Sequence, residues 1–352
     1  MPNSSHVHYR LFVDINGTII SADQLRGKDE ESANYEMIAE TIKAQWEVDK
    51  EEMTYKDFVD TCLIPGDTND DKIKPARLAC YRNVINACKA LSEEKYNEAN
   101  ILFQQLSVSL SEHNKVFTSF ITLIDYLNNN QVNYSIILRT FGPDAPDTIK
   151  ELEQRTSLRF KKYYDFSETK LSREEIITEL LALPKEEHIG WRDQYAYWKA
   201  MQFSYKGAKY HSIDLKNPND VDIFFDDNLK AKSILNVGLQ GFSLDPDINP
   251  DLFQKHLQNT LLEMGLLVCV DSMKAKIDDN YFIQAFQKVQ TFALEKLIAK
   301  LPLIVEQTRQ EQFELTHSTV SDNKSAFFKP SVATNVKEVP ERLSLYQQTY
   351  RP

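Results

Sequence analysis

The chain has 352 residues, of which 42% are hydrophobic and 26% are charged, a composition typical of a folded globular protein. Its formal net charge of -11 at pH 7 argues against nucleic acid as a partner, because binding to a phosphate backbone depends on a surplus of basic residues. We expect neither a transmembrane segment nor a secretory leader, since no apolar run is long enough for the first and the N-terminal residues lack the apolar core of the second.

The first predicted element is a short strand near the N-terminus. Residues 9–13 are an apolar run that ends at Asp14, and Gly17 follows as a turn signal. We interpret this run as a buried strand that stops at the acid. From residue 23 to residue 112 glycines are few and apolar residues recur every three or four positions. This spacing predicts an inserted helical subdomain.

The next segments alternate between helix and strand. Residues 116–127 place their apolar side chains on one helical face, and residues 134–138 form an apolar run after an Asn-rich break. Residues 147–155 have a second helical pattern, and the stretch VDIFFDDN at 221–228 is an apolar strand that ends in acids. Helices that alternate with buried strands predict an α/β fold with a parallel sheet.

The C-terminal third is predicted to be helical and then polar. Residues 252–264 and 281–300 have the pattern of two amphipathic helices. From about residue 306 the chain becomes polar, which predicts a tail more than a packed element.

Polar clusters follow three of the predicted strands. The clusters are Asp14 with Asn16 and Thr18, then Arg139 with Thr140, and then Asp226 with Asp227. In an open parallel sheet, ligands bind outside the carboxyl ends of the strands, so these clusters can converge. Three carboxylates would form a hard oxygen site suited to Mg²⁺, which neutralises a phosphate while a carboxylate attacks phosphorus. Alone, the first cluster is usually a turn, the last is more often a solvated strand end or a helix cap, and Arg139 with Thr140 indicates nothing. The order of the three clusters carries the prediction.

These segments carry a family resemblance. VDINGTII, IILRT and IFFDD resemble motifs one, two and four of the haloacid dehalogenase (HAD) superfamily of Asp-nucleophile phosphatases, over residues 9–235. VDSMKAKIDDNYF at 270–282 is similar to a further HAD branch and extends the resemblance to residue 295. The resemblance implies a Rossmann-like three-layer core with a parallel sheet and an inserted helical C1-type cap. The implied divisions are 1–22 and 113–240 for the core, 23–112 for the cap, 241–305 for helices packed on the core, and 306–352 for a polar tail.

The resemblance also implies a nucleophile and a metal site. Asp14 would attack phosphorus and form an aspartyl-phosphate. Asp226 and Asp227 would hold Mg²⁺ together with Asp14 and the backbone carbonyl of Asn16.

Further roles are implied for substrate contacts and for a lysine. Thr140 would bind the phosphoryl oxygens, and the substrate-binding set would be Gly17, Thr18, Arg139 and Thr140. The third motif of the superfamily is a lysine that screens the nucleophile from the phosphate. Lys209 is favoured because it lies in the segment that leads to IFFDD, while Lys199 and Lys206 are alternatives.

Asn16 departs from the family pattern, which usually has an acid two residues after the nucleophile. An amide cannot transfer a proton, and loss of such a group typically costs about 10² to 10⁴ in rate. A phenolate leaves more easily than an alkoxide, so Asn16 favours aryl phosphates, phosphotyrosine included, or acyl phosphates. Unless His211 or Asp193 serves as the base, the aspartyl-phosphate would persist.

The predicted cap contains candidate substrate contacts of two kinds. Aromatic residues could stack on a phenyl ring and basic residues could attract an acidic peptide, although aromatic residues at helical spacing usually form a core. The candidates are Trp46, Tyr55, Phe58 and Tyr81 for the first kind, and Lys72, Lys74, Arg77 and Arg82 for the second.

The predicted function is therefore a Mg²⁺-dependent phosphomonoester hydrolase whose favoured substrate is protein phosphotyrosine or another aryl phosphate. The alternative, motivated by Asn16, is a catalytically weak HAD-like protein that binds phosphate or Mg²⁺ without turnover. Four scattered cysteines favour a reducing compartment such as the cytoplasm. The chain is also similar to HAD-type tyrosine phosphatase effectors of intracellular bacteria, which implies translocation into a host cell, with Glu338 and Glu341 in a C-terminal signal.

Overall fold

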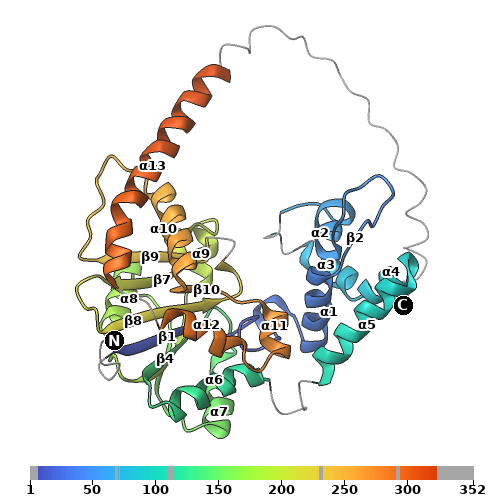
Figure 1. Cartoon of the computed structure of the whole chain (residues 1–352), viewed down its shortest axis with the longest axis horizontal. Coiled ribbons are helices and arrows are strands. Elements are labelled where there is room, and N and C mark those ends of the chain that lie inside the picture. Colours follow the sequence, from blue (N-terminus) through green and yellow to red (C-terminus); the bar gives the residue numbers. More distant parts are fainter. Residues whose placement is uncertain are drawn as a thin grey trace. The chain divides into compact units, whose positions relative to one another are not determined.

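The computed structural model describes residues 7–67, 70, 72–108, 115–229, 233–290 and 294–322 (Figure 1). The chain divides into two compact units, residues 1–308 and residues 309–352. Helix α13 (Leu294–Asp322) begins in the first unit, and its residues from 309 onward are the described part of the second unit. All other described elements belong to the first unit.

Six parallel strands form the central sheet in the part of the chain that the structure describes, in the order β10-β8-β1-β4-β6-β5. They are β1 (His8–Asp14), β4 (Asn133–Thr140), β5 (Phe160–Asp165), β6 (His188–Arg192), β8 (Asp220–Asp226) and β10 (Leu267–Cys269). The predicted parallel α/β architecture is confirmed, and it is compatible with a Rossmann-like fold. The three strands predicted from apolar runs are β1, β4 and β8, which are neighbours within this sheet.

Helices flank the strands and make up most of the described part of the inserted segment, residues 23–112. Those of the inserted segment are α1 (Glu30–Thr41), α2 (Tyr55–Phe58), α3 (Lys74–Tyr81), α4 (Val84–Leu91) and α5 (Glu93–Val108). The others before α13 are α6 (Thr118–Asn129), α7 (Ala145–Arg155), α8 (Arg173–Leu181), α9 (Tyr195–Ala200), α10 (Pro250–Met264), α11 (Ser272–Ile277) and α12 (Tyr281–Val289). The helices predicted near 116–127, 147–155 and 252–264 are confirmed as α6, α7 and α10.

Side chains alternate between two faces along β1, as the pleat of a strand requires. Tyr9 meets Phe286 of α12 with ring centroids 5.0 Å apart, whereas Phe12 meets His211 at 4.8 Å. His211 belongs to β7 (Lys209–Asp214), which pairs with β9 (Leu235–Gln240) in a separate parallel sheet. Figure 1 shows β7 and β9 on one side of the central sheet and α6 on the other. Asp14 has the parity of Phe12, so its side chain lies on the face that β7 covers.

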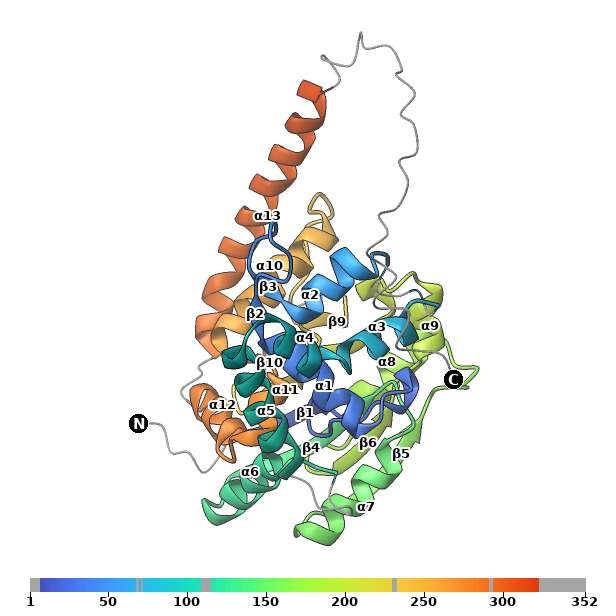
Figure 2. The same cartoon turned by 90° about the vertical axis from the view of Figure 1, so that its right-hand side faces the viewer.

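The inserted segment leaves and rejoins the core at one place. Ile20 forms an antiparallel bridge with Val116, and the Phe117 N–H donates to the Ile19 carbonyl over 2.8 Å. Figure 2 shows α1 to α5 grouped together beside the short strands β2 (Lys43–Ala44) and β3 (Met53–Thr54). The helical character predicted for this segment is confirmed over its described residues, and the β2-β3 ribbon is an addition that helical spacing did not predict.

The C-terminal helices differ from the predicted pattern in two ways. The helix predicted at 281–300 is divided between α12 and α13, with residues 291–293 outside the described residues. Helix α13 continues past residue 306, where a polar tail was predicted, and Thr308 within it is fully buried. Glu338 and Glu341 lie outside the described residues. None of the described helices has the length and apolar character needed to cross a membrane.

Candidate functional site

Three aspartates meet at the carboxyl ends of β1 and β8. In the sheet register, Asp14 is paired with Arg139 of β4, and Val13 is paired with Phe225 of β8, the residue before Asp226. Adjacent parallel strands that end at the same level place their terminal side chains together. One carboxylate oxygen from each of Asp14, Asp226 and Asp227 lies within 4.8 Å of the others. We call these three residues the carboxylate cluster.

Lys209 neutralises part of this cluster. Its ammonium group pairs with Asp226 Oδ2 at 2.8 Å and also with Asp14 Oδ1, and the lysine side chain is only 2% exposed. Its position at the start of β7, above the face that carries Asp14, explains how it reaches both acids. The other two candidate lysines have exposed side chains, and Lys206 forms an ion pair with Asp251 at 3.5 Å. The structure therefore brings Lys209 to the carboxylates.

The surroundings of two of the acids, Asp14, which is buried, and Asp227, which is half-buried, disfavour their charge. Burial raises the pKa of Asp14 to about 7, opposed by the Lys209 charge and supported by Asp226. Burial also holds the pKa of Asp227 well above its usual range, and the neighbouring Asp226 and Asp14 add to the effect. Ionising all three carboxylates against one ammonium would leave a surplus of negative charge in a medium of low dielectric constant. The cluster can therefore accommodate a further cation.

The loop after β1 fits closely against Asp227. Gly17 has φ +75°, and a Cβ atom added there would lie 2.8 Å from Asp227 Cγ, so both the backbone and the available space require glycine. The Thr18 hydroxyl accepts from the Asp227 N–H at 3.1 Å and lies 3.4 Å from Asp14 Oδ2. Asn228 donates from its side chain to Asp227 Oδ1 over 2.8 Å. These contacts hold the orientation of Asp227.

Asn16 is bonded to a carboxyl group that the sequence did not single out. Its Oδ1 accepts from the Thr140 hydroxyl at 3.0 Å, and its Nδ2 donates to Asp144 Oδ2 at 2.8 Å and to the Ala22 carbonyl at 3.0 Å. Asp144 is 4% exposed, and burial raises the pKa of its carboxyl group. It is the N-cap residue of α7, yet its side chain caps no backbone N–H. The predicted phosphate-binding threonine is thereby linked through Asn16 to Asp144.

Three residues that the sequence suggested for chemistry are engaged elsewhere. Arg139 forms a buried two-point ion pair with Asp193, at 2.9 Å and 2.6 Å, so both side chains serve the core. His211 lies between Phe12 and Phe224, with ring centroids 4.8 Å and 5.2 Å away, and burial lowers its pKa to about 3. Neither Asp193 nor His211 is hydrogen-bonded to Asn16.

Helix α11, from the motif at 270–282, links the β1 loop to the inserted segment. The Ser272 hydroxyl donates to the Gly17 carbonyl. Lys276, four residues further along, is buried, donates to Asn34 Oδ1 over 2.7 Å and pairs with Glu30 at 3.3 Å. Both partners of Lys276 lie on α1. This helix therefore positions α1 relative to the loop that follows Asp14.

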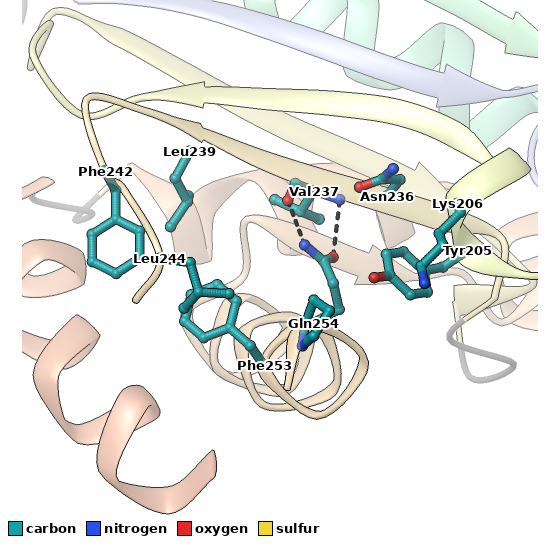
Figure 3. A pocket seen from close by; sticks show the side chains of 10 residues that line it. Tyr205, Lys206, Asn236, Val237, Leu239, Phe242, Leu244, Phe253 and Gln254 are labelled. Carbon is teal, nitrogen blue, oxygen red and sulfur yellow. Dashed lines mark hydrogen bonds between the residues drawn. The ribbon is translucent and has the colours of Figure 1, made fainter. Parts of the chain in front are cut away.

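A separate cavity lies beside β9 and α10 (Figure 3). Apolar side chains such as Phe242 and Phe253 line one end, and Tyr205 and Lys206 lie at the other. Gln254 accepts from the N–H of Val237 at 3.1 Å and donates to its carbonyl at 2.6 Å. This pairing closes the edge of β9 at that residue to an added strand. The carboxylate cluster does not line this cavity.

Comparison with known proteins yields no match to a family model, a curated protein or a solved structure. The HAD resemblance therefore depends on the motif residues themselves. A functional interpretation depends on the chemistry of the groups that the fold assembles.

Proposed function

We propose that this protein is a Mg²⁺-dependent phosphomonoester hydrolase of the HAD type, with Asp14 as its nucleophile and aryl phosphates as its favoured substrates. Protein phosphotyrosine is the favoured member of that class. The observation that carries the proposal is the cluster of Asp14, Asp226 and Asp227 at the carboxyl ends of β1 and β8, with Lys209 paired to the first two. The inserted segment is then the cap that admits the substrate.

The donor set suits Mg²⁺. All three acids offer hard carboxylate oxygens, and the one ammonium group offsets only part of their charge. Asp226 and Asp227 would hold the ion together with Asp14 and the Asn16 backbone carbonyl. When bound, Mg²⁺ would offset the negative charge of the substrate phosphate.

The residues of the chain have distinct roles in this reaction. A carboxylate oxygen of Asp14 forms a bond to phosphorus while the bond from phosphorus to the leaving oxygen breaks. Lys209 favours the ionised form of Asp14, because its ammonium group contacts that carboxylate. When the substrate binds, the Thr140 hydroxyl turns its proton from Asn16 Oδ1 to a phosphoryl oxygen. Water then attacks the aspartyl-phosphate and restores Asp14.

Asn16 supports the choice of aryl substrates. Its amide cannot protonate a leaving oxygen, so a leaving group that is stable as an anion is favoured. A tyrosine phenolate, from a hydroxyl of pKa near 10, meets this requirement far better than an aliphatic alkoxide. The same feature favours the alternative, a protein that binds Mg²⁺ and phosphate without turnover.

The test is phosphate release from a phosphotyrosine peptide and from p-nitrophenyl phosphate, with and without Mg²⁺. Wild type is compared with Asp14→Asn, which keeps the shape of the side chain, and with Asp125→Asn, an exposed control on α6. We expect metal-dependent release by wild type and the control, and none by Asp14→Asn. Full activity of Asp14→Asn would refute the proposal, and Mg²⁺ binding without release by wild type would favour the alternative.

A further inference from the structure

The inserted segment contains a cavity of its own, lined mostly by charged side chains. Five of these side chains are basic, and two carboxylates, Glu36 and Asp60, stand among them. The residues come from the turn before α1, from α1 itself, from α2 and the turn that follows it, and from α3. We call this space the basic cavity. Its surplus of positive charge contrasts with the net charge of -11 of the whole chain.

At one side of the basic cavity, a single carboxylate lies near two basic side chains. Glu36 is buried and pairs with Lys28 at 2.7 Å, while the nearest approach of Arg26 to Glu36 is 3.9 Å. The Arg26 side chain is 46% exposed, so its guanidinium group retains donors for a ligand. Lys28 and Glu36 thus satisfy each other, and Arg26 adds positive charge beside them.

At the other side, Asp60 forms ion pairs with two basic side chains. It pairs with Lys56 at 2.9 Å and with Arg77 at 3.3 Å, and it accepts a hydrogen bond from the Tyr81 hydroxyl. Arg77 is buried and also donates to backbone carbonyls, one of them the Ile64 carbonyl at 2.8 Å, which gives it a structural role. Lys56 is 24% exposed and remains within reach of a ligand in the cavity.

The basic residues of the first side lie on a turn next to the loop that follows Asp14. The Asn16 side chain donates to the Ala22 carbonyl over 3.0 Å, and the next residue, Asp23, begins the turn that carries Arg26 and Lys28. A tight turn fixes these two basic residues, because the Asp23 N–H donates to the Lys28 carbonyl over 2.8 Å and the Lys28 N–H donates back over 2.9 Å. A substrate held at Asp14 can therefore meet this turn with a second group.

We propose that the basic cavity binds a carboxylate of the same substrate molecule whose phosphate reacts at Asp14. This inference depends on the proposed function, and it specifies the substrate as a phosphotyrosine peptide with an acidic residue beside the phosphotyrosine. The cavity has room for a small group, with about 50 Å³ of free space, which suits a carboxylate. Arg26 provides a planar set of donors that matches the two oxygens of that carboxylate.

The experiment compares two phosphotyrosine peptides that differ only in the flanking residues, Glu in one and Gln in the other. The quantity measured is the ratio of their kcat/KM values with Mg²⁺ at constant ionic strength, so that a general loss of activity cancels. We expect wild type to prefer the Glu peptide about ten-fold, the effect of one hydrogen bond between charged groups. Arg26→Met should bring the ratio close to one, and Lys56→Met should lower it.

Lys50→Met is the matched control, because Lys50 is an exposed lysine of the same segment that does not line the cavity. It should keep the wild-type ratio, and thermal unfolding should show that all three variants are folded. Equal cleavage of both peptides by wild type would overturn this inference and leave the proposed function intact. A preference that survives in both Arg26→Met and Lys56→Met would also overturn it. No cleavage of either peptide by wild type would overturn the proposed function and this inference together.

Discussion

Lys209 is a buried cation between two buried acids, with its Nζ 2.8 Å from Asp226 Oδ2 and in contact with Asp14. Removing one partner of a buried ion pair leaves the other charge without compensation, which is far more costly than losing an exposed pair. The role proposed for Lys209 in the reaction and its effect on stability therefore come from the same contacts.

We expect Lys209→Met to abolish phosphatase activity and to lower the free energy of unfolding by about 3 to 5 kcal/mol without metal. Mg²⁺ should restore part of the lost stability, because it neutralises the same carboxylates. Denaturant titration with and without Mg²⁺ measures both effects, and Lys199→Met is the exposed control. A Lys209→Met variant as stable as the control would contradict the ion pairing.

Asp144 is the carboxyl group bonded to Asn16, and we expect it to affect the second step of the reaction. With Asp144→Asn, p-nitrophenyl phosphate should give a rapid burst of one equivalent of nitrophenolate. Steady turnover should then be slower by about 10² to 10⁴, the usual cost of losing a general base. The exposed Asp147→Asn on the same helix is the control. Wild-type turnover by Asp144→Asn would show that another group activates water.

The motif residues could be predicted from the sequence, whereas Asp144 could not. Asp14, Thr140, Asp226 and Asp227 end apolar runs, a signal that a single sequence carries. Asp144 precedes a helix, where aspartate is usually an N-cap, and only the three-dimensional contacts show that its side chain turns to Asn16 instead.

The loop that follows β1 contains Gly17, where an added side chain would cause both backbone strain and a steric clash. Comparison with Gly27 separates these two effects. Gly17 and Gly27 both have positive φ values, +75° and +65°. A Cβ at Gly17 would collide with Asp227, whereas a Cβ at Gly27 would meet nothing within 4 Å. The two positions thus form a matched pair.

We expect Gly17→Ala and Gly27→Ala to cost about 1 kcal/mol each in backbone strain. Gly17→Ala should in addition displace Asp227 and weaken Mg²⁺ binding at least ten-fold, about 1.4 kcal/mol or more. Calorimetric titration with Mg²⁺ measures the affinity, and denaturant titration measures the strain. Equal Mg²⁺ affinity in the two variants would show that Asp227 does not hold the ion.

The elements that the sequence revealed are those with a simple burial pattern. Strands β1, β4 and β8 lie inside the sheet, and each contains a short apolar run, LFV, IIL and IFF respectively. Strand β5 is at the edge of the sheet and half exposed, so its stretch FKKYYD has no such run. Strand β7 carries buried polar residues, Lys209 and His211 among them, so its sequence pattern is that of a surface segment.

For the molecule as a whole, buried polar groups link stability to pH. His211 is fully buried, and neither of its ring nitrogens has a hydrogen-bond partner among the described residues. Its folded pKa is lowered from 6.5 to about 3 by burial, with the charges of Arg10 and Arg139 adding to the effect. Because the unfolded chain takes up this proton first, the stability that neutral His211 provides is present above pH 6.5 and is lost as the pH falls towards 3.

We expect wild type to lose about 2 kcal/mol through this histidine between pH 7 and pH 5. His211→Phe should remove that loss at no cost in hydrogen bonds, because the site is formed by phenylalanine rings. Denaturant titration at both pH values measures the difference, with the exposed His317→Gln as the control. The same acid sensitivity in His211→Phe and wild type would assign the loss to other groups.

The candidate site exists only when the central sheet is assembled. Its residues lie on or next to β1, β7 and β8, which are far apart in the sequence of the first unit, and Thr140 lies at the end of β4. The sequence predicted the order of these parts and the parallel sheet that aligns them. It favoured Lys209 among three lysines, but the contact of Lys209 with the acids depends on how β7 lies over the sheet, which the sequence does not show.

The central claim is that Asp14 becomes covalently phosphorylated. The most direct measurement is to mix the protein with a ³²P-labelled phosphotyrosine peptide and Mg²⁺, quench in acid and map the protein-bound label. The acid quench should trap an intermediate that releases its label with hydroxylamine and maps to Asp14, and Asp144→Asn should raise the labelled fraction towards one phosphate per chain. Asp14→Asn should carry no label. Turnover without a labelled protein, or label at another residue, would contradict the account.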